Sequence, residues 1–346
     1  MLAVLALSMV VSVSAIFILK LFAEQLGLVD LPDSRKQHNQ PIPQVGGLAI
    51  LSSLIAVVLV FPFVYTSHWL LVVSLFSISL LGALDDKFNL DYRLRLSVVS
   101  FLALIMIVSG VELKSFGDIV GIGSLSLGVF SAVITICAVL GNVNAFNMID
   151  GIDGLLLSMS LVSLTCLTFV FYSHGSKEHA LMCAVLLASL IPCLMANVGM
   201  LGTSAKIFMG DSGSMFLGMF IIWMLISASG DNIAAMRPST ALWLIAVPLM
   251  DMTAVIISRC LSKKLPFTAG RDHIHHILLQ RGMTKTTTLI LLTFVAITFA
   301  LVGLSFEFFD ISETLSFSLF VGLFLIYFVT MRASLVVQNL VKSLNS

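Results

Sequence analysis

Long apolar runs divided by short polar stretches constrain the fold of this chain more than any other feature. Hydrophobic residues make up 59% of its 346 residues and charged residues only 10%, which excludes an ordinary soluble domain. A helix needs about 20 apolar residues to cross a bilayer, and the runs here have about that length. The sequence therefore predicts an all-α polytopic integral membrane protein.

We expect eleven membrane-spanning helices, which form a single integral membrane domain over residues 1–346. Their predicted positions are near 1–21, 46–65, 69–84, 94–109, 126–142, 155–173, 179–198, 213–229, 240–258, 287–306 and 313–331. The first run has no basic residue before it, and Lys20 follows it. A secretory signal peptide has the opposite polarity, so we expect this run to be an uncleaved span.

The distribution of lysine and arginine indicates the orientation, because these residues gather in cytoplasmic loops. With the N-terminus outside, fifteen of the eighteen basic residues fall on the cytoplasmic side, and Lys114, Lys177 and Arg237 fall outside. The odd number of spans puts the C-terminus in the cytoplasm. The predicted cytoplasmic loops lie near 22–45, 85–93, 143–154, 199–212 and 259–286.

The balance of charge and the cysteine pattern exclude other classes of protein. Eighteen basic and eighteen acidic residues give no net charge, so nothing indicates a nucleic-acid partner. The five cysteines include no C-x-x-C pair, and we expect apolar packing residues rather than a disulfide framework or a zinc site.

Three polar islands place carboxylates beside the ends of apolar runs, all on the predicted cytoplasmic side. They are Asp85-Asp86, residues 142–155 and residues 210–213. A carboxylate at membrane depth costs about 2.5–3.5 kcal/mol on insertion scales and marks a functional site by default. Adjacent carboxylates repel each other, and one of them tends to stay protonated unless a cation is near. Magnesium, bound through one or two carboxylates and substrate phosphates, removes that repulsion, so we expect the active site at the cytoplasmic face.

The island at 142–155 has the most specific pattern. Asn144, Asn147 and Asp150 recur every three residues, so a helix would put them on one face, with Asp153 continuing it. Their amide and carboxylate groups suit a sugar or a nucleobase edge. An ordinary helix end is the alternative, but it explains the glycines and not the polar stripe.

The next island, Gly210-Asp211-Ser212-Gly213, leads into the eighth span and could seat a phosphate or a metal at a helix N-terminus. The alternative is a helix cap by Asp211 or Ser212. Asp251 lies within the ninth predicted span, where it would face the site or pair with a neighbouring helix.

Basic side chains and histidines supply the remaining candidates. Arg93 and Arg95 are two residues apart, so on a helix one could meet a phosphate while the other extends to the interface. Lys36 and His38 could bind a lipid phosphate or be ordinary juxtamembrane residues. The histidines lack the i, i+4 spacing of a helical zinc site, and contact with a phosphate or sugar fits them better than a solvated loop does; they are His273, His275 and His276.

These islands, in this order, resemble the polyprenyl-phosphate N-acetylhexosamine-1-phosphate transferase superfamily. The resemblance covers about residues 30–285 and is carried by residues 41–47, 85–86, 144–155, 210–214 and 273–276. Any single motif is weak, whereas the ordered set is highly specific. The span count also agrees with this superfamily.

The resemblance implies transfer of N-acetylglucosamine 1-phosphate from UDP-N-acetylglucosamine to undecaprenyl phosphate, which releases UMP. It implies a bacterial inner-membrane enzyme that begins lipopolysaccharide O-antigen or enterobacterial common antigen synthesis, with Mg²⁺ as cofactor and Mn²⁺ as a substitute. A sister branch transfers phospho-N-acetylmuramoyl-pentapeptide and has a third consecutive histidine where Ile277 follows His276 here. That difference favours a plain UDP-amino sugar; another UDP-N-acetylhexosamine and a homodimer stay open.

The resemblance also implies roles for single residues. The catalytic candidates are Asp85, Asp86, His273, His275 and His276. The metal candidates are Asp211, Asp85 and Asp86. The substrate-binding candidates are Asn144, Asn147, Asp150, Asp153, Gly154, Leu155, Arg95 and Arg271. The basic stretch before the second span adds Lys36 and His38 to them.

Two mechanisms and a second class of function remain open. The acceptor is a phosphate monoester with a second pKa of about 6, so it can attack the β-phosphate directly without a strong base. The competing scheme forms a covalent aspartyl-phosphate on Asp85 or Asp86. An ion-coupled secondary transporter would need carboxylates near span midpoints and a repeated architecture; among these islands and spans only Asp251 lies deep, and the sequence has no clear repeat.

Overall fold

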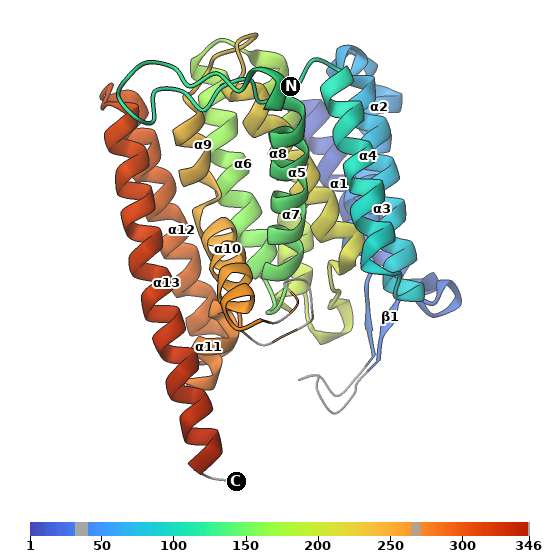
Figure 1. The fold of residues 1–346 in the computed structure, drawn as a ribbon. Helices are drawn as coiled ribbons and strands as arrows, with labels where there is room; N and C mark the ends of the chain where they lie inside the picture. Colours follow the sequence, from blue (N-terminus) through green and yellow to red (C-terminus); the bar gives the residue numbers. More distant parts are fainter. Residues whose placement is uncertain (32–40, 264, 266–269, 271, 345–346) are drawn as a thin grey trace.

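The computed structural model describes residues 1–31, 41–263, 265, 270 and 272–344. Helices that run side by side form a bundle (Figure 1). The α-helices are α1 (Leu2–Leu26), α2 (Gly46–Val60), α3 (Trp69–Phe88), α4 (Tyr92–Val108), α5 (Ser131–Ile149), α6 (Leu155–Ser173), α7 (Lys177–Asn197), α8 (Gly210–Ser229), α9 (Pro238–Leu244), α10 (Ala246–Leu261), α11 (Ile274–Gln280), α12 (Lys285–Phe308) and α13 (Glu313–Leu344).

A few short elements join these helices. Strands β1 (Val29–Asp30) and β2 (Ile42–Pro43) pair antiparallel after α1. Single 3₁₀ turns cover Pro62–Val64, Thr66–His68, Gly128–Phe130 and Thr203–Ala205.

The described helices confirm a polytopic all-α membrane protein. Eight are long and apolar enough to cross a membrane, and α9 with α10 would make a ninth span. The other two predicted spans correspond to α2, with 15 residues, and α4, with 17 residues. The number eleven and the orientation therefore stay predictions.

The predicted ninth span is not one straight helix. Its two halves, α9 and α10, meet at an angle of 87°. Pro248 lies in the first turn of α10. Because proline has no N–H, it cannot donate to the carbonyl of Leu244, and its ring disfavours a continuous helix there.

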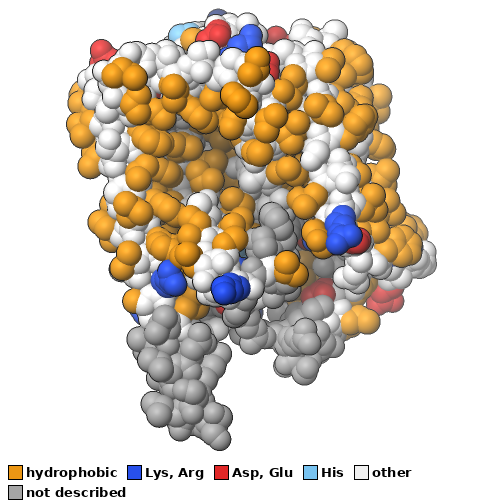
Figure 2. Space-filling view, viewed as in Figure 1, with side chains coloured by type: hydrophobic (Ala, Val, Ile, Leu, Met, Phe, Trp, Pro, Cys, Tyr) orange, Lys and Arg blue, Asp and Glu red, His pale blue; other side chains and the backbone are white. Residues whose placement is uncertain are grey.

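Helix α8 forms the centre of the bundle. It packs against α2, α3, α5 and α6, and nearly all of its residues are buried. By contrast, α12 and α13 expose many large apolar side chains. Hydrophobic side chains cover most of the face in Figure 2 between the two ends, as expected of a surface that contacts lipid tails.

Two glycines allow neighbouring helices to approach the first turn of α8. A Cβ on Gly82 in α3 would overlap the backbone of Asp211 and Ser212, and a Cβ on Gly47 in α2 would overlap Gly213. Small residues at such crossings let backbones meet closely. As a result, the last turn of α3, with its aspartate pair, lies directly against the first turn of α8.

The polar islands gather at one end of the bundle, which we call the site end. It comprises residues 85–95, 147–155, 206–214 and 272–280 and lies at the bottom of Figure 1, with α11 and β1. The N-terminus lies at the opposite end, whereas the last turns of α13 lie at the bottom. An odd number of crossings would produce this arrangement.

Candidate active site

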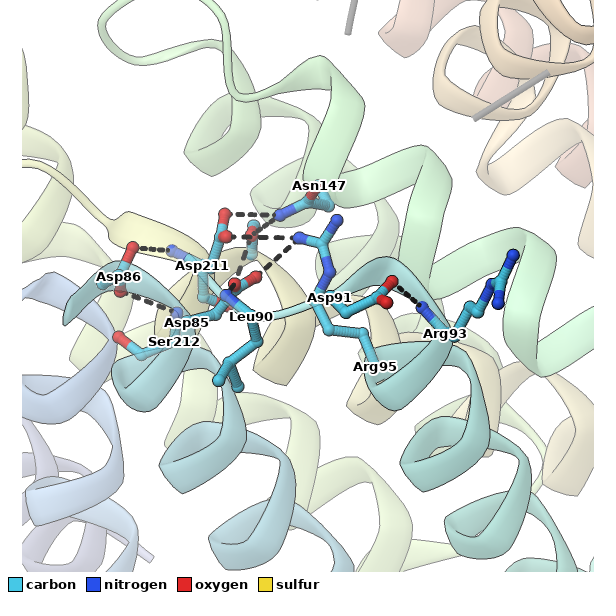
Figure 3. Close-up of polar contacts among 10 residues, drawn as sticks. Asp85, Asp86, Leu90, Asp91, Arg93, Arg95, Asn147, Asp211 and Ser212 are labelled. Atoms are coloured by element: carbon cyan, nitrogen blue, oxygen red, sulfur yellow. Dashed lines mark hydrogen bonds and ion pairs between the residues drawn. The ribbon is translucent and has the colours of Figure 1, made fainter. Parts of the chain in front are cut away.

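Asp85 is a buried carboxylate in the last turn of α3. Its Oδ1 accepts a hydrogen bond from the Leu90 N–H at 2.7 Å, and its Oδ2 lies 2.6 Å from Nη1 of Arg95. The same Nη1 lies 3.5 Å from Oδ2 of Asp211 (Figure 3). Arg95 therefore links two of the predicted metal-binding aspartates. The exposed Arg93 contacts Tyr92 instead, so only one of the two arginines enters the cluster, as their spacing predicts.

Asp86 caps helix α8 from a different helix. Its two carboxylate oxygens accept hydrogen bonds from the backbone N–H groups of Asp211 at 2.8 Å and Ser212 at 3.2 Å. A helix leaves its first N–H groups without intrahelical partners, and an anion is favoured there. The alternative that Asp211 or Ser212 caps the helix is therefore wrong, because the close approach at Gly82 brings Asp86 to the free N–H groups.

Asn147 connects α5 to this cluster. Its Nδ2 donates to Oδ1 of Asp211 at 2.7 Å and to Oγ of Ser214 at 2.9 Å. Asn144 lies one turn earlier, and its amide donates to the Leu140 carbonyl of its own helix. Both asparagines line the same cavity, described below, which confirms this part of the predicted polar stripe.

The stripe does not continue as a helix to Asp153. Helix α5 ends at Ile149, and residues 150–154 form a turn that leads to α6. Gly154 ends that turn with φ of 84°, a left-handed conformation that favours glycine. Asp153 pairs with Lys206 at 2.7 Å. The glycine-containing turn thus replaces the helical geometry that we predicted for Asp153.

Several predicted site residues lie away from the cluster or outside the described part of the chain. The Gly154 N–H donates to Oδ1 of Asn197 at 2.5 Å, and Leu155 is buried at the start of α6. Neither is among the residues that line the two cavities below. Lys36, His38 and Arg271 lie outside the described residues.

The three predicted histidines lie at the start of helix α11. His273 precedes the helix, and His275 and His276 lie in its first turn. Nδ1 of His273 lies 2.8 Å from Oδ2 of Asp251. His275 is buried, neither of its ring nitrogens has a hydrogen-bond partner among the described residues, and its ring lies against Gly151. Burial lowers the pKa of His275 to about 3, and the neighbouring His276 adds to this effect. His275 is therefore a neutral ring packed against the α5–α6 turn.

Two cavities lie between these groups. The larger measures about 480 Å³, and its lining includes Asp86, Asp150, Asp153, Asp211, Lys206, Lys285 and His276. The smaller measures about 290 Å³, and its lining includes Tyr92, Arg95, Asn144, Asn147, His273, His275 and His276. Asn147, Gly151 and His276 line both, so the cavities are adjacent. The larger cavity combines carboxylates and lysines, whereas the described lining of the smaller one has no carboxylate and includes all three histidines.

Burial and the neighbouring carboxylates both affect the pKa of Asp150, which lies just after α5. Burial raises the pKa of Asp150 to about 7, and the charges of Asp86 and Asp153 add to the rise. A cation in the larger cavity would oppose both effects, because an opposite charge favours the ionised carboxylate.

The donors in the larger cavity fit a hard divalent cation. Asp86, Asp150 and Asp211 supply oxygen ligands, and none of the described residues that line this cavity is a cysteine. Among the described residues, no three histidine, cysteine or acidic side chains are arranged to hold a metal by themselves. Mg²⁺ does not need such a cage, because it keeps several waters and binds one or two carboxylates plus substrate phosphates. The buried Asp85 lines neither cavity, so Asp86 and Asp211 are better placed than Asp85.

Sequence reasoning missed several residues that line the larger cavity. Lys206 lies five residues before Asp211 in the same polar island, so its position could have marked it as a partner for phosphate. The other missed polar residues are Asp30, Gln44, Asn197, Gln280 and Lys285. They come from five separate segments, and no spacing in the sequence relates them to the aspartates.

Comparison with known proteins identifies the family of this chain. Residues 68–229, from the start of α3 to the end of α8, match the model of glycosyl transferase family 4. A Yersinia pestis undecaprenyl-phosphate alpha-N-acetylglucosaminyl 1-phosphate transferase is 37% identical over 91% of this chain and 87% of its own length. Proteins of the same name from Escherichia coli K12 and Haemophilus influenzae are 35% and 36% identical, over 85% and 90% of this chain and 80% and 88% of their own lengths. The chain therefore belongs to glycosyl transferase family 4, within the family of undecaprenyl-phosphate alpha-N-acetylglucosaminyl 1-phosphate transferases.

Proposed function

We propose that this phospho-sugar transferase moves N-acetylglucosamine 1-phosphate from UDP-N-acetylglucosamine to undecaprenyl phosphate and releases UMP. The observation that carries the proposal is the meeting of Asp86, Asp150 and Asp211 with Lys206 in one cavity at the site end. The names of the relatives supply the acceptor and the transferred group. We place the site at the cytoplasmic face of the bacterial inner membrane, because nucleotide sugars are made in the cytoplasm.

The larger cavity suits the diphosphate of the donor. Mg²⁺, or Mn²⁺ in its place, would be held by Asp211 and Asp86 and would neutralise charge on the diphosphate and on the departing phosphate. Lys206 and Lys285 line the same cavity and can hold further phosphate oxygens. Arg95 contacts one carboxylate oxygen of Asp211, and Asn147 donates a hydrogen bond to the other. These two contacts hold the Asp211 carboxylate in a set position.

The acceptor phosphate can attack directly. It is mostly dianionic at neutral pH, so no residue has to remove a proton. A bond forms between its oxygen and the β-phosphorus, and the bond from that phosphorus to the bridging oxygen breaks, which leaves UMP. Asp85 accepts from Arg95 and the Leu90 N–H, and Asp86 from two backbone N–H groups. Hydrogen bonds to both carboxylates weaken them as nucleophiles, which favours direct attack over an aspartyl-phosphate.

Direct attack predicts no exchange in the absence of lipid. Labelled UMP should enter UDP-N-acetylglucosamine only when undecaprenyl phosphate or the lipid product is present. Delipidated protein that catalyses exchange at the full rate, and loses it in Asp85→Asn or Asp86→Asn, would instead establish a covalent intermediate.

The proposed substrates can be tested by transfer of radiolabel into a lipid extract. Purified protein with undecaprenyl phosphate and Mg²⁺ should transfer label from UDP-N-acetylglucosamine faster than from UDP-N-acetylgalactosamine, UDP-glucose or UDP-N-acetylmuramoyl-pentapeptide. Preferred transfer from one of the other donors would overturn the assignment of the sugar while leaving the reaction type intact.

The proposed sidedness can be tested with two exposed serines at opposite ends of the bundle. Ser262 follows α10, and Ser124 lies in the segment between α4 and α5. After removal of the five native cysteines, Ser124→Cys should react with a membrane-impermeant maleimide in intact cells, whereas Ser262→Cys should react only after permeabilisation. The reverse pattern would place the site on the side that lacks UDP-sugars.

A further inference from the structure

Asp251 is a buried carboxylate at which three segments of the chain meet. From α10, its Oδ2 lies 2.8 Å from Nδ1 of His273, just before α11. Its Oδ1 accepts hydrogen bonds from the Ile274 N–H at 2.9 Å and from the Tyr327 hydroxyl of α13 at 2.7 Å. A buried charge is tolerated only when it is paired and hydrogen-bonded, and here three donors meet that condition.

The same contacts fix the orientation of His273. An ionised carboxylate can only accept hydrogen bonds, so Nδ1 of His273 carries the proton. Nε2 is then the ring nitrogen that remains, and the hydrogen bond of His273 to Asp251 leaves it free of that contact. In the neutral ring this atom is an acceptor. His273 lines the smaller cavity with Arg95, Asn144 and Asn147, so Nε2 is the polar atom that the ring can offer there.

A second contact ties the same two segments together. Nε of Arg259, near the end of α10, lies 3.2 Å from Oδ2 of Asp272. Two neighbouring residues, Asp272 and His273, are thus both held by α10. The chain before α11 is consequently attached at two points, and Tyr327 connects this attachment to the last helix.

We infer that Asp251, itself held by Tyr327, is a positioning residue that keeps Nε2 of His273 available as a hydrogen-bond acceptor for the sugar of the donor substrate. The inference rests on the proposed function for the identity of that ligand. The larger cavity carries the carboxylates and lysines that suit a diphosphate. The described lining of the smaller one has no carboxylate, and its polar side chains are two asparagines, three histidines, Tyr92 and Arg95. A sugar with hydroxyl groups and an amide N–H supplies the donors that such a lining would accept.

Asp251→Asn provides a specific test, because it changes the proton position without changing the side-chain volume. Two donors, the Ile274 N–H and the Tyr327 hydroxyl, would keep the amide oxygen of the variant at the Oδ1 position. The amide NH₂ would then face Nδ1 of His273 and force the ring proton onto Nε2. The ring nitrogen at the cavity would become a donor, and a substrate N–H or hydroxyl would lose its acceptor.

The expected effect is a fall in kcat/KM for UDP-N-acetylglucosamine of roughly 10- to 100-fold in Asp251→Asn. The KM for undecaprenyl phosphate should stay within about twofold. Tyr327→Phe, which removes one hydroxyl group, should give a fall of roughly 3- to 10-fold. Matched controls are Asp231→Asn and Tyr172→Phe, which alter exposed residues at the opposite end of the bundle and should leave kcat/KM unchanged.

A double-mutant cycle separates positioning from a general effect on packing. If Asp251 acts through His273, adding Asp251→Asn to His273→Ala should change kcat/KM by less than about twofold. Losses that multiply in the double variant would overturn the inference, as would wild-type kcat/KM in a folded Asp251→Asn protein. If Asp251→Asn does not fold, the same cycle between Tyr327→Phe and His273→Ala decides the question.

A measurement without turnover keeps this inference separate from the proposed function. In protein labelled with ¹⁵N-histidine, the His273 signals, assigned by their loss in His273→Ala, should show the proton on Nδ1 in the wild type and on Nε2 in Asp251→Asn. Absence of sugar-phosphate transfer by the wild-type protein would refute the proposed function without changing these spectra. A proton on Nε2 in the wild type would refute the role of Asp251.

Discussion

Asp211→Asn is expected to abolish sugar-phosphate transfer while the protein still inserts and folds. The substitution keeps the size of the side chain but removes the charge that would bind Mg²⁺ in the larger cavity. It also removes the negative partner 3.5 Å from Arg95. We expect turnover to fall by at least about 1,000-fold, the upper range for loss of one electrostatic contact in an active site.

Asp91→Asn is the matched control for this experiment. Asp91 belongs to the same polar stretch, but it accepts from the Arg93 N–H and caps α4, away from the cluster (Figure 3). Asparagine caps helices about as well as aspartate, so turnover should change little. Near-normal turnover of Asp211→Asn at saturating Mg²⁺ would show that Asp211 does not bind the metal.

Gly82→Ala should lower turnover by about 100-fold or more, although the added methyl group touches no substrate. A Cβ at this position would overlap the backbone of Asp211 and Ser212, and a backbone cannot rotate away as a side chain can. The helices α3 and α8 would have to separate, which would pull Asp86 from the N–H groups that it caps. A displacement of about 1 Å in an active site can cost a factor of about 100.

Gly322→Ala tests whether this effect comes from the contact rather than from the helix. Gly322 lies within α13, and a Cβ there would meet no described atom within 4 Å beyond the nearby backbone of its own helix. Both substitutions raise helix propensity, so they differ mainly in the contact at Gly82. Thermal unfolding in detergent should show a lower midpoint for Gly82→Ala and no decrease for Gly322→Ala. Equal activities of the two variants would contradict the role of the close approach.

The sequence allows the polar islands to be found but does not show how they contact one another. Membrane-length runs predict where the helices lie, and the spacing of Arg93 and Arg95 predicts that only one joins the site. The cap of α8 by Asp86 could not be predicted, because 125 residues separate the hydrogen-bonded partners. Periodicity describes one helix at a time and does not show which helix ends meet.

Departures from simple periodicity account for two further differences between the predicted and the observed structure. Pro248 alone does not show whether the helix is kinked or continuous, so the bend between α9 and α10 could not be predicted from the sequence. Asp153 does not continue the predicted helical stripe, because the turn at 150–154 begins immediately after Ile149. In both cases local backbone geometry overrides a pattern that counts residues.

The contacts of Asp251 also bear on the alternative of an ion-coupled transporter. That hypothesis needs a carboxylate within the membrane that is available to bind a coupling ion. Asp251 is the deep carboxylate that the sequence offered, and its oxygens accept from His273, Ile274 and Tyr327. These contacts fit a carboxylate that serves the site end better than one that binds and releases ions.

The fate of the β-phosphate tests the central proposal most directly. UDP-N-acetylglucosamine labelled with ³²P in the β-phosphate and ¹⁴C in the sugar should be supplied with undecaprenyl phosphate and Mg²⁺. We predict that both labels enter the lipid in a one-to-one ratio and that unlabelled UMP is released in equal amount. Transfer of ¹⁴C alone, with the ³²P remaining in released UDP, would contradict sugar-phosphate transfer and establish transfer of the sugar instead.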